Sequence, residues 1–253
     1  MAVSLSALVA NANTVLQPEN FQDYCPNGLQ VEGRATISLL VSGVTASLAL
    51  VDAAIEAGAD AILVHHGYFW NGENPCIVGM KGQRIRRLLQ HDISLLAYHL
   101  PLDAHPQLGN NAQLARQLGL SIKGGLQPQA EFPIGNHGEL DAAQSAQEFA
   151  HYVSATLGRE VLLEAVGEKP IKRVAWCTGG AQSYLSQAAA LGVDCFLTGE
   201  VSEQTIHEAR ELGVHFIAAG HHATERYGAP AVAQHIAREL GIKHRFIDID
   251  NPA

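Results

Sequence analysis

The sequence of 253 residues has few charged side chains and no long apolar run. Charged residues make up 16% of it, whereas 47% of its residues are hydrophobic. An average protein is about 25% charged, and disordered chains and coiled coils are polar by comparison, so both of these classes are excluded. The longest uncharged segments, 35–51 and 174–193, contain Ser, Thr and Gly. Neither is the run of about 20 apolar residues that spans a membrane.

Paired cysteines and early basic residues are missing too. The four cysteines are scattered and form no CxxC pair, which favours reduced thiols over a disulfide framework or a zinc knuckle. No lysine or arginine precedes Arg34, whereas a secretory signal begins with positive charge and a transit peptide is rich in arginine. We therefore expect a cytoplasmic protein with no membrane segment.

Positive charge is also scarce in the chain as a whole. The chain has 16 lysines and arginines and 25 aspartates and glutamates, which gives a net charge of −9. A nucleic-acid-binding protein needs a basic surface to neutralise phosphates, and a single-strand binder also needs aromatic stacking platforms. With that charge and only 6% aromatic residues, the sequence argues against a nucleic-acid partner.

Short β-branched runs alternate with segments of helical spacing. The strand-like runs are Ile37–Val41, Ala61–Val64, Ile93–Ala97, Arg173–Trp176, Asp194–Leu197 and Val214–Ala218. Helical stripes lie at 51–55, 149–157 and 232–240, and a glycine follows each of them at the place where a left-handed residue ends a helix. This alternation predicts an α/β fold in which helices flank the sheets.

Glycine and proline cluster over residues 119–136, where helical spacing fails. Such a cluster is typical of a loop or linker. The sequence therefore predicts a first α/β unit at 1–124 and a second at 125–221. Residues 222–253 can pack with either unit, and the first unit is the one we predict that they could join.

The two halves of the sequence resemble each other. Val41–His66 aligns with Ala175–Glu200, so that a strand, a helix ending in Gly-x-Asp and a second strand coincide. The match resumes where His99-x-x-x-Asp103 aligns with His221-x-x-x-Glu225. An internal repeat of two α/β units would place these motifs on either side of a crevice, although any two α/β segments align loosely.

Thirteen histidines are present, and several of them follow the predicted strands. His65 and His66 end one strand, just before Gly67. Adjacent residues of a regular strand point to opposite faces, so both imidazoles can serve one site only if the strand ends there and the chain turns. Ligands of open α/β sheets bind at the carboxyl ends of strands. The alternative is one histidine in the core and one in solvent.

Carboxylates follow two further strand ends at a spacing of four. Pro101 stiffens the loop between His99 and Asp103, which can hold both side chains on one side. His221 and Glu225 open the next helix, where residues four apart share a face. Taken alone, Asp103 could be a turn cap, and Glu225 could simply favour the helix dipole.

Considered together, three imidazoles and two carboxylates come from three strand ends. They are too few to saturate two metal ions separately, so one carboxylate would have to bridge them. Such a site would activate a water molecule as a nucleophile, and mixed nitrogen and oxygen ligation suits Zn, Fe, Mn or Co. The candidate metal ligands are His65, His66, Asp103, His221 and Glu225.

Six sequence words, in order over nearly the whole chain, resemble the dinuclear-metal, hexameric α/β family whose members are called GTP cyclohydrolase 1 type 2 homologues. The words are Asp23-Tyr-Cys-Pro-Asn-Gly-Leu-Gln-Val31, His65-His66-Gly67, Tyr98-His99-x-x-x-Asp103, Gly135-Asn-His-Gly-Glu-Leu140, Leu197-Thr-Gly-Glu200 with His207, and Gly220-His-His-Ala-Thr-Glu225.

The resemblance implies the same five metal ligands. One metal ion would take His66 and Asp103, and the other would take His65 and His221, with Glu225 bridging the two. The resemblance also implies a toroidal homohexamer whose metal sites face an internal cavity.

Two further residues are candidates for the chemistry itself. His99 is not a ligand in the family pattern, but the repeat aligns it with His221, so we expect it to act as a general acid or base, or to support the metal ligands. The repeat aligns Glu200 with His66, so Glu200, together with His207, should also lie close to the metal ions. Asn27 and Gln30 could contact a substrate or a neighbouring subunit.

The leading interpretation is a dinuclear metal-dependent hydrolase, in which metal-activated water attacks a nucleotide-like or heterocyclic substrate. The sequence contains no glycine-rich phosphate-binding loop that would indicate a nucleotide substrate. The alternative is a non-catalytic, metal-loaded ring that binds a ligand or serves in assembly. Open coordination positions would favour catalysis, because structural metal sites are usually closed by protein ligands.

Overall fold

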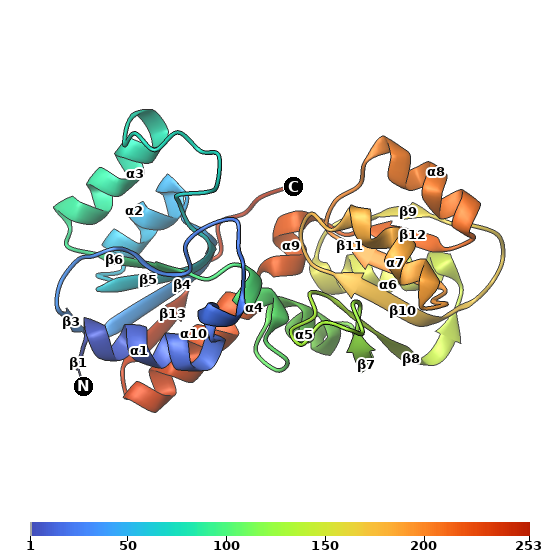
Figure 1. The fold of residues 1–253 in the computed structure, drawn as a ribbon, viewed down its shortest axis with the longest axis horizontal. Coiled ribbons are helices and arrows are strands. Elements are labelled where there is room, and N and C mark those ends of the chain that lie inside the picture. The colour runs from blue at the N-terminus through green and yellow to red at the C-terminus, as the bar shows by residue number, and fades with distance from the viewer. Residues whose placement is uncertain (1) are drawn as a thin grey trace. The chain divides into compact units, whose positions relative to one another are not determined.

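A computed structural model describes residues 2–253, and the chain divides into two compact units (Figure 1). Unit 1 contains the chain up to Leu102 together with Gly228–Asp250. Unit 2 contains Asp103–Tyr227 and Asn251–Ala253. Among the described helices, none combines the length and the apolar character needed to cross a bilayer.

These boundaries differ from the sequence-based ones at residues 124 and 221. The glycine and proline cluster is a hairpin inside unit 2, because β7 (Ser121–Gly125) pairs antiparallel with β8 (Asn136–Gln144). The first boundary lies instead between Leu102 and Asp103, and the second follows Tyr227. Most of the C-terminal stretch supplies a helix and an edge strand to unit 1.

Unit 1 is built on a five-stranded sheet with the order β13-β4-β5-β6-β2. The first four strands run parallel, and β2 is antiparallel to β6. The strands β1 and β3 form a separate two-stranded antiparallel sheet. The strands are β1 (Val3–Ser4), β2 (Gly28–Val31), β3 (Thr36–Ile37), β4 (Leu39–Thr45), β5 (Ala61–His66), β6 (Ser94–Ala97) and β13 (Lys243–Phe246).

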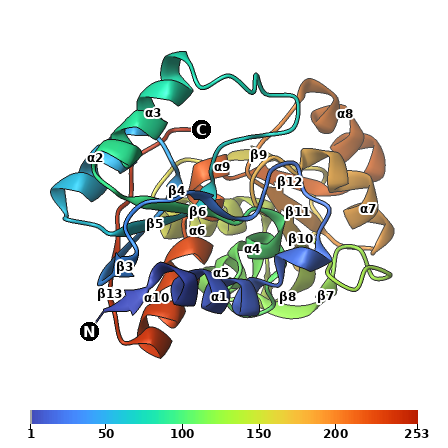
Figure 2. The ribbon, with the colours of Figure 1, turned by 60° about the vertical axis from the view of Figure 1, so that its left-hand side comes forward.

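Helices cover both faces of this sheet (Figures 1 and 2). One face packs against α2 and α3 through buried residues such as Val51 and Leu88. The other face packs against α10, which also contacts α1. Serine side chains cap the helices α1 and α2 at Ser4 and Ser47. The helices are α1 (Leu5–Leu16), α2 (Leu48–Glu56), α3 (Gly79–Gln90) and α10 (Gly228–Leu240), with a short 3-10 helix at Pro18–Asn20.

Unit 2 is built on a six-stranded sheet with the order β7-β8-β10-β11-β12-β9. Its three central strands, β10, β11 and β12, run parallel, and the remaining strands are antiparallel to their neighbours. The strands not yet given are β9 (Leu162–Glu164), β10 (Ile171–Cys177), β11 (Cys195–Thr198) and β12 (His215–Ala218).

The core of unit 2 also has a layer on each face of the sheet. Trp176 is fully buried with α5 and α6 on one face, and Phe196 is fully buried with α7 and α8 on the other. A capping box of Ser145 and Glu148 starts α6. The helices are α5 (Asn110–Gln117), α6 (Ala146–Leu157), α7 (Leu185–Ala190), α8 (Glu203–Leu212) and α9 (His221–Glu225), with a 3-10 helix at Gln182–Tyr184. Helix α4 (Leu100–Ala104) contains the boundary between the units.

The predicted α/β class is confirmed, with helices flanking both main sheets. Each of the six strand-like runs overlaps an observed strand, and the stripes at 51–55, 149–157 and 232–240 lie in α2, α6 and α10. The aligned halves share the order strand, helix, strand, at β4-α2-β5 and β10-α7-β11. The internal repeat itself stays a prediction.

Candidate metal centre

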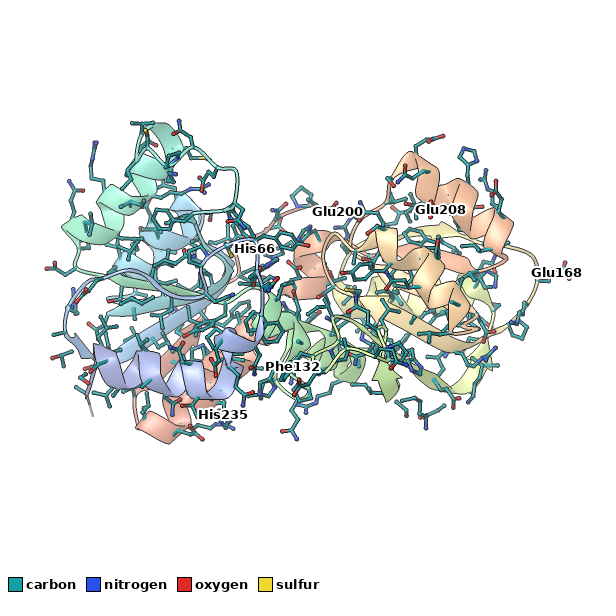
Figure 3. All side chains as sticks on the ribbon, in the orientation of Figure 1. His66, Phe132, Glu168, Glu200, Glu208 and His235 are labelled. Atoms are coloured by element: carbon teal, nitrogen blue, oxygen red, sulfur yellow. The ribbon has the colours of Figure 1, made fainter. Side chains whose placement is uncertain are left out.

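Three imidazoles gather at the carboxyl ends of two parallel strands in unit 1. His65 and His66 (the latter labelled in Figure 3) are the last residues of β5. His99 follows β6. The ring centroids of His65 and His66 are 4.4 Å apart, and that of His99 lies 5.1 Å and 5.8 Å from them. β5 ends at His66, and at the next residue, Gly67, a Cβ would overlap the Gln30 side chain and lie 2.5 Å from the Ala97 Cβ. The rings of the two adjacent histidines lie close together, although successive side chains of a regular strand point to opposite faces.

The Nδ1 atom of each imidazole faces an oxygen atom within unit 1. His65 Nδ1 lies 3.1 Å from the Tyr98 carbonyl oxygen, and His66 Nδ1 lies 3.1 Å from Thr45 Oγ1. A carbonyl oxygen can only accept, so His65 carries its proton on Nδ1 and has its lone pair on Nε2. Histidines that bind metal ions are usually oriented in this way by a partner of the other ring nitrogen.

The second group of side chains belongs to unit 2. His221 and Glu225 lie one turn apart on α9, with His221 Nε2 3.2 Å from Glu225 Oε2. Glu200, which follows β11 (Figure 3), accepts a hydrogen bond from His221 Nδ1 at 2.6 Å. The Nδ1 atom of this fourth imidazole is thus also held by an oxygen atom.

Asp103 belongs to the same group. Its carboxylate oxygen lies within 4.8 Å of a carboxylate oxygen of Glu225, and both side chains are buried. Asp103 Oδ1 accepts hydrogen bonds from Asn110 Nδ2 at 2.9 Å and from Thr178 Oγ1 at 3.3 Å. Burial and then the charges of Asp103 and Glu225 raise the pKa of the Cys177 thiol well above its usual value. Two buried carboxylates this close repel each other, and either a nearby cation or a shared proton relieves the repulsion.

His221 provides that positive charge when no metal ion is bound. Burial alone would lower its pKa, but the hydrogen bonds and charges of Glu225 and Glu200 outweigh burial and raise the pKa of His221 to about 9. Below that pH the imidazole is protonated and pairs with both carboxylates. A metal ion would have to displace this proton, because only a neutral imidazole can be a ligand.

Glycine at position 179 leaves room for the acidic group. Its φ is +70°, and a Cβ there would overlap Glu225 Oε1 and lie 3.1 Å from His221 Nε2. The Gly179 backbone N–H donates to Thr224 Oγ1 at 3.0 Å, which ties this turn to α9. Any larger residue would displace Glu225.

The other residues considered in the sequence have roles within their own unit. His207 pairs with Glu203 on the exposed side of α8 at 3.0 Å. Asn27 accepts a hydrogen bond from the His99 backbone N–H, and Gln30 accepts one from the backbone N–H of Tyr68. The sequence did not predict that Asn27 and Gln30 would hold the backbone of the segments that carry the histidines.

Sequence reasoning missed two oxygen partners, Thr45 and Asp23. Asp23 Oδ1 lies 2.7 Å from His99 Nδ1. It is 76 positions away from His99 along the chain, and no spacing rule connects them. The only signal was its place at the start of the Asp23–Val31 word.

Comparison with known proteins places this arrangement in a family. A family model described as Duf34/NIF3 (NGG1p interacting factor 3) matches residues 3–252. The chain belongs to the Duf34/NIF3 family. Its relatives include a Pseudomonas aeruginosa protein named GTP cyclohydrolase 1 type 2 homolog, which is 60% identical over 253 residues and covered completely, as is this chain. An Escherichia coli K12 protein of the same name is 53% identical over 242 residues, which are 95% of this chain and 96% of the relative.

Solved structures share the fold of this chain. A structure titled protein ybgI, unknown function, superposes with a TM-score of 0.95 at 51% identity, covering 99% of this chain and 100% of that one. The protein TTHA1606 from Thermus thermophilus gives a TM-score of 0.90 at 32% identity with the same coverage. HcgD from Methanocaldococcus jannaschii, titled as reduced, gives 0.82 at 21% identity over 99% of each chain, which speaks for the fold alone.

Replacing Glu200 with glutamine should weaken metal binding without removing it. The substitution takes away the charged partner that orients His221, and losing such an outer partner costs about 10-fold to 100-fold in metal affinity. Competition with a chromophoric chelator measures the change in affinity. Glu203→Gln is the matched control, because Glu203 pairs in the same way with His207 at an exposed position. Equal affinities for the wild type and Glu200→Gln would contradict the role given to Glu200.

Proposed function

We propose that this Duf34/NIF3 protein holds two divalent metal ions and uses them in hydrolysis. The ligands would be His65 and His66 from unit 1 and Asp103, His221 and Glu225 from unit 2. The observation that carries the proposal is the orientation of the imidazoles. In all three histidines of this set, Nδ1 faces an oxygen atom, from Tyr98, Thr45 or Glu200.

The donor set fits such ions. Imidazole nitrogen and carboxylate oxygen without thiolate suit Zn, Fe, Mn or Co. Cys177, whose thiol pKa is raised by burial and by the charges of Asp103 and Glu225, stays protonated and offers no thiolate. The paired carboxylates of Asp103 and Glu225 supply the negative charge that two cations would neutralise. When bound, the ions would lower the pKa of a coordinated water molecule and stabilise negative charge on the substrate.

The chain's own residues would do the rest of the work. Glu200 holds the His221 ring in one orientation, and Asn110 and Thr178 fix the Asp103 carboxylate by hydrogen bonds. His99 lies beside His65 and His66 without belonging to the proposed ligand set. In that position it can donate or accept a proton as bonds to the substrate form and break.

A nucleotide-like or heterocyclic substrate is our proposal for the substrate class. Its support is the printed name of the relatives, GTP cyclohydrolase 1 type 2 homolog. We also propose a toroidal homohexamer, supported by the resemblance of the six sequence words to the family. Neither proposal changes the metal ligands.

Turnover by metal-loaded protein tests the hydrolase. Protein reconstituted in turn with Zn²⁺, Mn²⁺, Co²⁺ and anaerobic Fe²⁺ would be screened against nucleoside triphosphates, cyclic heterocycles, phosphoesters and small amides, with and without chelator. We expect product formation that chelator abolishes, that metal restores and that Glu225→Gln lacks. Full metal occupancy with no chelator-sensitive turnover on any class would contradict the hydrolase and favour a metal-loaded ring that binds or assembles.

A further inference from the structure

The Asp23 carboxylate is buried in unit 1 and surrounded by hydrogen-bond donors. Its side chain is 2% exposed, so water does not compete for it. Four donors reach its two oxygens at 2.6–2.9 Å, two on each: the Tyr24 backbone N–H and His99 Nδ1 on Oδ1, and Asn27 Nδ2 and the Leu100 backbone N–H on Oδ2. A carboxylate accepts about four hydrogen bonds, so Asp23 is saturated.

Saturation decides between two roles for Asp23. Asp23, Cys25 and His99 lie close enough to be considered as metal ligands. However, a metal ion would have to replace hydrogen bonds that already fill the carboxylate. Burial and the charge of Asp23 also raise the pKa of the Cys25 thiol to about 12, so Cys25 keeps its proton. The group is therefore better suited to holding His99 than to holding an ion.

The hydrogen bonds also fix the ionisation of Asp23. Burial alone would raise its pKa, but the bonds from His99, Asn27 and Leu100 outweigh burial and lower it. Asp23 is thus a charged acceptor at neutral pH. A charged carboxylate opposite His99 Nδ1 requires the proton on that nitrogen, which leaves the lone pair of a neutral ring on Nε2.

The same loop holds the backbone of His99. The His99 N–H donates to Asn27 Oδ1 at 2.7 Å. The imidazole packs edge-to-face against Trp70 at 5.0 Å between ring centroids, and against Tyr24 at 6.1 Å. Backbone, ring plane and Nδ1 are therefore all fixed before any substrate binds, and the His99 side chain remains 16% exposed.

We propose that Asp23 is the positioning residue for His99: it holds His99 as the Nδ1–H tautomer, so that Nε2 is the atom presented to the substrate. The use of Nε2 as a general base or acid rests on the proposed function. The tautomer and its dependence on Asp23 do not. Water that loses a proton to Nε2 would leave a doubly protonated imidazolium, stabilised by Asp23 until the proton passes to the leaving group.

The substitution Asp23→Asn tests which ring nitrogen of His99 carries the proton. An amide has one accepting oxygen and one donating nitrogen, so its nitrogen must face one pair of the four donors. If this nitrogen faced Leu100 and Asn27, it would meet two donors that cannot become acceptors. One is the Leu100 backbone N–H, and the other is the Asn27 side-chain amide, which cannot turn because its oxygen accepts from the His99 backbone N–H. Facing the other pair, it meets the Tyr24 backbone N–H and the His99 ring, and the ring can change tautomer, so only one donor there loses its acceptor. We therefore expect the His99 proton to move to Nε2.

Neutron diffraction from deuterium-exchanged, zinc-loaded crystals measures the proton positions directly. The proposal expects a deuteron on His99 Nδ1 in the wild type and on Nε2 in Asp23→Asn. Asn71→Ala is the matched control, since it removes a bond to the Asp23 backbone oxygen and leaves the carboxylate untouched. It should keep the wild-type tautomer. A wild-type deuteron on Nε2 in place of Nδ1, or an unchanged tautomer in Asp23→Asn, overturns the proposal.

Metal content and kinetics complete the test. Zinc per chain should be the same in the wild type and Asp23→Asn, and a loss of zinc would make Asp23 part of the metal site and overturn its positioning role. If the protein turns over a substrate, Asp23→Asn should lower kcat about 100-fold with little change in KM, and it should add nothing to His99→Gln. Proton positions are read without turnover, so failure of the hydrolase would leave this result standing.

Discussion

Glu225→Gln should abolish the binding of both proposed metal ions. Glu225 would bridge them, and removal of a direct ligand should exceed the 10-fold to 100-fold loss in affinity that follows removal of an outer partner. Elemental analysis after dialysis against metal-free buffer measures the loss. We expect two ions per chain in the wild type and fewer than one in Glu225→Gln. Glu211→Gln, at an exposed position of α8, should keep the wild-type content.

Thermal unfolding distinguishes lost binding from lost folding in Glu225→Gln. Bound metal stabilises only the folded state, so the wild-type Tm should rise on adding metal while the Tm of the variant stays constant. Without metal, Glu225→Gln should still fold, because the lost pairing of Glu225 with the protonated His221 is offset by relief of the repulsion between two buried carboxylates within 4.8 Å. A variant that unfolds without metal or still binds two ions would contradict the bridging role.

Gly179→Ala should lower the free energy of unfolding and disturb the acidic group. A non-glycine residue in the left-handed region costs about 1–2 kcal/mol, and forcing a buried group aside costs about 1–3 kcal/mol more. The Cβ would overlap Glu225 Oε1. Urea unfolding of metal-free protein measures the free energy, and the same displacement of Glu225 should weaken metal binding.

Gly158→Ala controls for the backbone cost of Gly179→Ala. Gly158 also has a φ of +70°, but a Cβ there meets no atom within 4 Å. It should therefore cost only about 1–2 kcal/mol for the left-handed conformation and leave metal affinity unchanged. If both variants lost the same free energy of unfolding and bound metal equally well, the close approach of Gly179 to Glu225 would contribute nothing to stability or metal binding.

The fold was readable from the sequence because local signals and burial agree in it. The β5 run Ala61–Val64 is fully buried on both faces, as expected for a central parallel strand, and glycines such as Gly158 end helices in the left-handed conformation. The domain boundary was not readable. Gly124 and Gly125 look like a linker, but they lie in a strand whose partner comes after a loop.

The grouping of candidate ligands within each unit could be predicted for a similar reason. His65 and His66 end β5, and the His221/Glu225 pair follows β12, and ligands of α/β sheets lie at the carboxyl ends of parallel strands. That these residues bind metal ions stays a prediction. The residues that orient those ligands follow no such rule. Thr45 and Asp23 act through tertiary contacts, and their residue types are common in turns and caps. Only coordinates show that they face His66 and His99.

Our central proposal is that residues of both units hold a pair of metal ions. Anomalous diffraction from crystals of metal-loaded protein, collected on either side of the metal absorption edge, tests this claim most directly. We expect two anomalous peaks about 3.5–4 Å apart, with His65 and His66 as ligands, together with Asp103 and His221, and with Glu225 between the peaks. Peaks that lie away from these side chains, or a single ion bound without Glu225, would contradict the account.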